Sequence, residues 1–270
     1  MDLKAYYDGS GKPDDPNSQW LTLAGYAGSE GAWERVRENW LGCLSAETNP
    51  QCPRSKSGNP YFHSVEAFNL REGYAVKLGW NTLKVLSLAR RLLNVLAPVE
   101  RSDLIGFSTS IRLSDYRSVK EHEIPALRRP EAICVDGCIG TMLRHPFLHP
   151  VEPPTETIEP LPGLANIFFD KGDKFFGILN NAWKKKEHGE RTWWASMVRS
   201  IEQVEDMRDD VGIQCADLLA WQMNRYHTLG PEDDWGLYTP SMFIVKAHYH
   251  TTFDRDGILA ACNPDGSYRS

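Results

Sequence analysis

The spacing of apolar residues predicts strands at several places along the chain. Residues 3–7 form a short apolar and aromatic run that leads into Asp8-Gly9-Ser10-Gly11, a pattern typical of a strand that enters a glycine-rich loop. Residues 164–169 form a continuous apolar run that ends at Asp170, as expected of a buried strand. Further strands are expected at residues 20–26, 104–113 and 201–204.

Apolar spacings of three and four predict the helices. Residues 31–44 repeat large apolar side chains at this spacing, and Ser29 stands where an N-cap is expected. Further helices are expected at residues 75–96, 131–144, 173–187 and 213–226. Because strands come first and later alternate with helices, the order indicates an α/β fold, a mixed β-sheet flanked by helices.

The chain has 270 residues, which fits one decorated domain. Two proline-rich segments, residues 45–60 and 145–163, have the composition of surface insertions. We therefore expect one domain over residues 1–227, with residues 228–270 as a C-terminal extension packed on it.

Composition narrows the functional class. The 36 acidic residues outnumber the 30 basic ones, for a net charge of −6, which argues against a protein that coats nucleic acid. The sequence has no run of about 18 apolar residues, so no membrane span is predicted. Its start has no basic segment followed by an apolar one, the pattern of a secretion signal. The six cysteines are scattered without a CxxC pair, as in a reducing compartment. A cytoplasmic location without membrane contact is the expectation.

Two predicted strands end in an acid, at Asp8 and Asp170. If these strands are neighbours, both carboxylates lie at one edge of the sheet, where ligands of open α/β sheets gather. Like charges so close repel, and one pKa rises unless a cation bridges them. Mg²⁺ prefers such oxygen ligands.

Two more acids join this hypothesis. Asp217 lies on the last predicted helix, in GIQCADLLAW, on a half-apolar face that it shares with Gln214. Such a carboxylate is costly to bury, so either Gln214 and backbone donors satisfy it or a metal does. In FHSVEAF, His63 and Glu66 are three residues apart and share a face of a helical turn. His63 could then orient a water or a ligand while Glu66 coordinates a metal.

Each candidate also has a purely structural interpretation. Asp8-Gly9 is a common hairpin dipeptide, although the next strand is too distant for a two-residue turn. Asp170 could begin a turn, and Asp217 could be an ordinary satisfied helix acid. Asp173 stands at an N-cap position, which is the preferred interpretation for it.

Together the four acids, Asp8, Glu66, Asp170 and Asp217, carry a charge that two Mg²⁺ or Mn²⁺ ions would neutralise, and paired divalent ions support phosphodiester cleavage. Their order along the chain resembles the ribonuclease H-like layout. Five segments are similar to the domain-of-unknown-function 3800 family, usually placed among ribonuclease H-like proteins: YYDGSGKP, LAGYAGSEGAWERVRENW, FHSVEAFN, IFFDKGDKF and GIQCADLLAW. The resemblance spans roughly residues 5–225 and implies the same four acids as the site. Family members usually carry glutamate where this chain has Gly9.

The leading hypothesis is a divalent-metal-dependent nuclease or phosphodiesterase with Asp8, Glu66, Asp170 and Asp217 as metal ligands and His63 assisting. The alternative is a catalytically silent ribonuclease H-like interaction module that has lost its metal; Gly9 and the acidic charge favour it. A carboxylate-pair glycosidase has no supporting motif. Nucleic acid could bind a local groove near Lys184-Lys185-Lys186, where tryptophans stand close in sequence. The oligomeric state is not predictable from the sequence.

Overall fold

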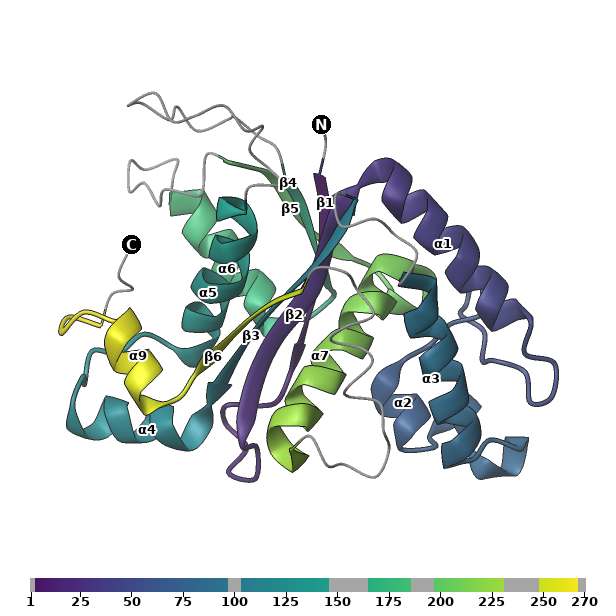
Figure 1. Cartoon of the computed structure of the whole chain (residues 1–270), viewed down its shortest axis with the longest axis horizontal. Coiled ribbons are helices and arrows are strands. Elements are labelled where there is room, and N and C mark those ends of the chain that lie inside the picture. Colours follow the sequence, from purple (N-terminus) through teal and green to yellow (C-terminus); the bar gives the residue numbers. More distant parts are fainter. Residues whose placement is uncertain (1–2, 97–102, 146–164, 186–196, 231–247, 267–270) are drawn as a thin grey trace.

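The computed structural model describes residues 3–96, 103–145, 165–185, 197–230 and 248–266. Within these ranges a mixed six-stranded sheet, in the order β5-β4-β1-β2-β3-β6, carries helices on both faces (Figure 1). The expected α/β class is confirmed at this level. The strands are β1 Leu3–Ser10, β2 Trp20–Ser29, β3 Leu104–Arg112, β4 Ala165–Asp170, β5 Val198–Val204 and β6 His248–Phe253. The helices are α1 Glu30–Ser45, α2 Ser64–Phe68, α3 Thr82–Leu96, α4 Leu113–His122, α5 Pro130–Arg144, α6 Lys174–Lys184, α7 Val211–Leu229 and α9 Arg255–Ala261, with short 3₁₀ turns η1 Glu72–Tyr74, η2 Val76–Leu78 and η6 Met207–Asp209.

The sheet combines an antiparallel meander with parallel additions. β1, β2 and β3 pair antiparallel in chain order, whereas β4 pairs parallel to β1 and β5 parallel to β4. β6 pairs parallel to β3, so part of the C-terminal extension is an edge strand of the sheet. Because β1 and β4 run side by side in the same direction, their carboxyl ends lie at one edge, as the sequence predicts.

Residue alternation divides the sheet into two faces. Tyr7 and Phe169 stack at 6.0 Å between ring centroids in the core under α5 and α6, while Tyr6 and Phe168 stack at 4.9 Å in the core that includes α7. α7 approaches the sheet closely because its second residue is a glycine: a Cβ on Gly212 would lie 2.4 Å from the Tyr6 ring. A larger residue there would push α7 away from β1.

Several predicted boundaries change in the structure. The helix expected at residues 31–44 is α1, and Ser29 caps it by accepting a hydrogen bond from the backbone N–H of Ala32 at 3.2 Å. The helix expected from residue 75 begins only at Thr82, because η1, η2 and a left-handed Gly79 (φ 89°) precede it. The prediction that a loop begins at Asp8 is wrong, because β1 continues to Ser10.

The two insertions differ in what can be said of them. Residues 45–60 are attached to η6 by hydrogen bonds. The side chains of Ser55, Ser57 and Asn59 donate them to the carboxylate of Asp209. The second insertion lies outside the described residues except for its first residue. Among the helices described, none combines the length and apolar character needed to cross a lipid bilayer.

Candidate active site

Asp8 and Asp170 lie next to each other on neighbouring strands. Each directly follows the last paired residues of β1 and β4, Tyr7 and Phe169. Since side chains alternate along a strand, both carboxylates point to the same face as Tyr6, the face that α7 covers. Both are half-buried. The sequence prediction that they share one edge is confirmed, although Asp8 lies within β1 rather than at its end.

Two further aspartates approach this pair from different elements. Asp217 of α7 is 5% exposed, and its Oδ2 accepts the backbone N–H of Ser64 at 2.7 Å. Asp173 is the N-cap of α6, where its Oδ1 accepts the backbone N–H of Phe175 at 2.6 Å. Asp173 also hydrogen-bonds to Asp8. We name Asp8, Asp170, Asp173 and Asp217 the aspartate cluster.

The electrostatics of the aspartate cluster oppose full ionisation. Burial raises the pKa of Asp8 well above its ordinary value, and the charges of Asp217 and Asp173 raise it further. Burial likewise raises the pKa of Asp170 and of Asp217. The pKa of Asp173 rises to about 6, mainly through burial, with the charge of Asp170 adding to it. The cluster therefore favours either a proton or a cation among its oxygens.

Glu66 is held differently from the aspartate cluster. Its buried carboxylate accepts hydrogen bonds from the Tyr61 hydroxyl at 2.8 Å and from the Arg208 guanidinium at 2.7 Å. Nδ1 of His63 lies 3.0 Å from Oε1 of Glu66, an ion-pair contact that falls short of a well-aligned hydrogen bond. Burial alone would raise the pKa of Glu66, but these three partners outweigh it and lower the pKa to about 2. Glu66 is thus a permanently charged support for His63.

α7 positions His63 through its two neighbours in the chain. Oε1 of Gln214 accepts the backbone N–H of Phe62 at 3.0 Å, and Asp217 accepts that of Ser64. The sequence left open that Gln214 donates a hydrogen bond to Asp217. In the structure the donor to Asp217 is the backbone N–H of Ser64. Although burial lowers the pKa of His63, contact with Glu66 and the charge of Asp217 outweigh it and raise that pKa. The most specific sequence motif therefore fixes the segment that carries His63.

Phe175 explains the glycine at position 9. A Cβ on Gly9 would lie 2.4 Å from Cε2 of Phe175, a core residue that is 3% exposed. The same Cβ would lie 3.4 Å from Oδ2 of Asp173. A carboxylate therefore stands beside position 9 although the chain has no side chain there.

The site contains three residues whose roles the sequence does not predict, or predicts only in part. Asp173 is predicted only as a cap, and it is a cap and a cluster member together. Arg208 and Tyr61 carry no motif, and Arg208 reaches Glu66 across 142 positions of the chain. Only the closeness of Asp170 and Asp173 in sequence, one turn apart, could have pointed to Asp173.

The donor set of the aspartate cluster fits a hard divalent cation, since its members offer only carboxylate oxygens. Among the described residues, no group of three or more His, Cys, Asp or Glu side chains is arranged so that it could hold a metal ion as it stands. Asp8, Asp170 and Asp217 are the residues that would hold it.

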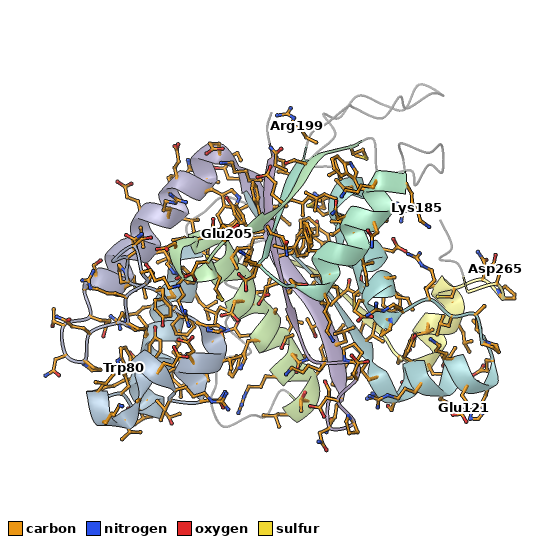
Figure 2. The ribbon with its side chains drawn as sticks, turned by 180° about the vertical axis from the view of Figure 1, so that it is seen from behind. Trp80, Glu121, Lys185, Arg199, Glu205 and Asp265 are labelled. Atoms are coloured by element: carbon orange, nitrogen blue, oxygen red, sulfur yellow. The ribbon has the colours of Figure 1, made fainter. Side chains whose placement is uncertain are left out.

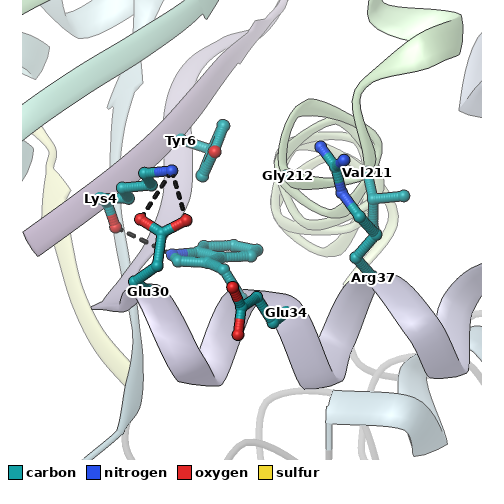
Figure 3. Close-up of a pocket in the computed structure, with 8 residues that line it drawn as sticks. Lys4, Tyr6, Glu30, Glu34, Arg37, Val211 and Gly212 are labelled. Atoms are coloured by element: carbon teal, nitrogen blue, oxygen red, sulfur yellow. Dashed lines mark hydrogen bonds and ion pairs between the residues drawn. The ribbon is translucent and has the colours of Figure 1, made fainter.

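A cavity of about 210 Å³ lies where α7 begins (Figure 3). The ammonium of Lys4 is 2.7 Å from the carboxylate of Glu30, and Glu34 and Arg37 also line the cavity. Asp210 caps α7 by accepting the backbone N–H of Ile213 at 3.0 Å. Acidic and basic side chains are therefore balanced around this cavity.

The lysine segment at residues 184–186 is only partly within the described ranges. Lys184 ends α6, where a cation complements the negative end of the helix dipole. Lys186 and the tryptophans at 193 and 194 lie outside the described residues. The predicted groove for nucleic acid at this segment therefore stays a prediction.

Comparisons of the chain with protein-family models, with curated proteins and with solved structures found no match.

Proposed function

We propose that this protein is a divalent-metal-dependent phosphodiesterase of the nuclease type, built on a ribonuclease H-like fold. The observation that carries the proposal is the aspartate cluster: Asp8 and Asp170 stand side by side on β1 and β4, and Asp173 at the N-cap of α6 and Asp217 of α7 interact electrostatically with them. Burial raises the pKa of all four carboxyls, and repulsion by other cluster members adds to the rise at Asp8, Asp173 and Asp217. Strongly perturbed carboxylates of this kind are typical of functional sites. The antiparallel β1-β2-β3 meander with β4 parallel to β1 is compatible with the fold.

The residues divide into ligands and supports. Asp8, Asp170 and Asp217 would hold Mg²⁺ or Mn²⁺, with Asp173 beside Asp8. When bound, the ion supplies charge stabilisation at a phosphoryl oxygen and a more acidic water. His63, whose Nδ1 faces Glu66, has Nε2 left to accept or donate a proton at the cluster. Glu66 keeps His63 in place, with Tyr61 and Arg208 behind it.

Variants of the two strand acids test the proposal. Asp8→Asn and Asp170→Asn should abolish Mn²⁺-dependent cleavage of oligonucleotides and weaken Mn²⁺ binding in calorimetry, while circular dichroism stays unchanged. Asp254→Asn is the matched control, because it makes the same substitution at an aspartate outside the aspartate cluster, the N-cap of α9. Cleavage by both strand variants at the wild-type rate would eliminate the proposal.

The second candidate is a catalytically silent interaction module with the same fold. Gly9 favours it, because Phe175 fills the space that a side chain at position 9 needs. The calorimetric titration separates the two candidates: a protein that binds no Mn²⁺ at millimolar concentration is the silent module.

A further inference from the structure

A second cavity lies at the end of the sheet where the strand of Asp8 finishes, on the side of α4 and α5 and not on the side of α7. Its volume is about 220 Å³, and it is lined by residues of the β1–β2 loop, of α4 and of the start of α5. β1 ends at this edge, β2 begins at it and β3 ends at it, because the three strands alternate in direction. The backbone N–H of Leu113 bonds to Gln19 O at 2.9 Å and fixes α4 beside the loop.

Two cations at this cavity have only neutral partners. Arg117 donates to the carbonyl oxygens of Pro13 at 3.1 Å and Asp15 at 3.3 Å. Lys120 donates to the Tyr116 hydroxyl at 3.3 Å and lies 5.7 Å from the centre of that ring. Both side chains are exposed, and no carboxylate of the described residues forms an ion pair with either one.

The other charges of the cavity cancel in pairs. Arg129 lies 2.7 Å from Glu131, whose carboxylate is nearly fully buried beneath the cavity. Asp14 lies 3.1 Å from Lys174. The balance is therefore positive, owing to Arg117 and Lys120, in a protein whose net charge is −6. The cavity of Figure 3 differs, because its charges are balanced.

The Asp14–Lys174 ion pair also joins the cavity to the aspartate cluster. Lys174 is the first residue of α6 and directly follows Asp173. The β1–β2 loop, which carries Asp14, begins where the strand of Asp8 ends. A strand that reaches both sites would have to pass along this loop, around the end of the sheet, to Arg117 and Lys120.

We propose that the Arg117–Lys120 cavity binds a phosphate group of a nucleic-acid strand, farther along the strand than the phosphate that the aspartate cluster acts on. The inference rests on the proposed function, because it takes the strand as the substrate. Cations without carboxylate partners suit phosphate, and the Tyr116 ring with Pro13 and Pro130 offers apolar surface for the attached sugar. The positive charge of this cavity would attract a nucleic-acid strand to a protein whose net charge is negative.

Binding of a fluorescent single-stranded oligonucleotide in EDTA, followed by anisotropy over a range of salt concentrations, tests this site. Loss of one phosphate contact lowers the slope of log K against log salt by about 0.7 for a single strand. Lys120→Ala should show this change and a several-fold weaker Kd, and Lys120→Arg should restore both. Lys77→Ala is the matched control, because Lys77 is an exposed lysine of η2 that does not line the cavity; Trp80, close to it in sequence, and Glu121, the neighbour of Lys120, are labelled far apart in Figure 2.

The outcomes distinguish this inference from the proposed function. Equal slopes for Lys120→Ala, Lys77→Ala and wild type overturn the phosphate site even if Asp8→Asn abolishes cleavage. Absence of oligonucleotide binding by the wild type also overturns it. A reduced slope for Lys120→Ala in a protein that cleaves nothing upholds the phosphate site and counts against the nuclease.

Discussion

Replacing Asp173 with asparagine should stabilise the metal-free protein at neutral pH. Asparagine caps a helix about as well as aspartate, so the bond to the Phe175 N–H is kept while the charge beside Asp8 is removed. Burial raises the pKa of Asp173 from its ordinary 3.8 to about 6. The folded protein therefore binds this proton more tightly than the unfolded chain does, and stability falls as pH rises from about 4 to about 6.

The size of the effect follows from the same two pKa values. One pKa unit corresponds to about 1.4 kcal/mol, and Asp173 is half-buried and coupled to Asp8, so we expect a gain of about 1–3 kcal/mol above pH 6. Urea unfolding in EDTA, followed by tryptophan fluorescence, measures it at pH 4 and pH 7.5. The gain should vanish at pH 4, where the wild-type carboxyl is protonated.

A control and a contrary result complete the experiment. Asp254→Asn replaces another capping aspartate, which accepts the backbone N–H of Gly257 at 2.9 Å on exposed α9 and lies outside the aspartate cluster, so it should not reproduce the gain at pH 7.5. If Asp173→Asn is less stable than the wild type at pH 7.5, or gains equally at both pH values, repulsion in the aspartate cluster is not what limits stability.

Three further substitutions have defined outcomes. Gly9→Ala should lower the free energy of unfolding by about 1–3 kcal/mol in urea titrations, because the added methyl group overlaps Phe175. Glu66→Gln should lower the pKa of His63, read by NMR titration, because burial then acts without the opposing carboxylate; an unchanged titration would refute the pairing. Gln214→Ala should lower the free energy of unfolding by about 2–4 kcal/mol, since it leaves buried N–H groups without an acceptor, whereas Gln214→Glu should recover part of that loss.

The positions of the strand acids could be predicted because they depend on local pattern. An apolar run that ends in an acid places Asp170 at the end of β4, and parallel pairing brings it beside Asp8. The extent of β1 could not be predicted in the same way. Asp8-Gly9-Ser10 has loop composition, yet pairing with β2 keeps these residues in the strand. Here tertiary pairing outweighs local propensity.

The support of His63 could be predicted from the sequence only in part. The spacing of His63 and Glu66 indicates their contact, which the structure confirms at 3.0 Å. It does not indicate Arg208, which comes from η6 and arrives only when the chain has folded. The Arg208–Glu66 pair depends on the packing of segments distant in sequence, so the spacing of residues along the chain does not predict it.

Glu66 and Asp8 differ in how the charge of each carboxylate is compensated, and this difference bears on the choice between the two candidate functions. Glu66 is ionised with a guanidinium, a hydroxyl and an imidazole around it, so its burial is compensated. Asp8 has no cation paired with it among the described residues, and three other aspartates surround it. A silent module would gain stability from replacing Asp8 or Asp173 by a neutral residue and would lose nothing. The raised pKa values mean that either a proton or a cation relieves this repulsion, so binding of Mn²⁺ at the aspartate cluster is the observation that separates the phosphodiesterase from the silent module.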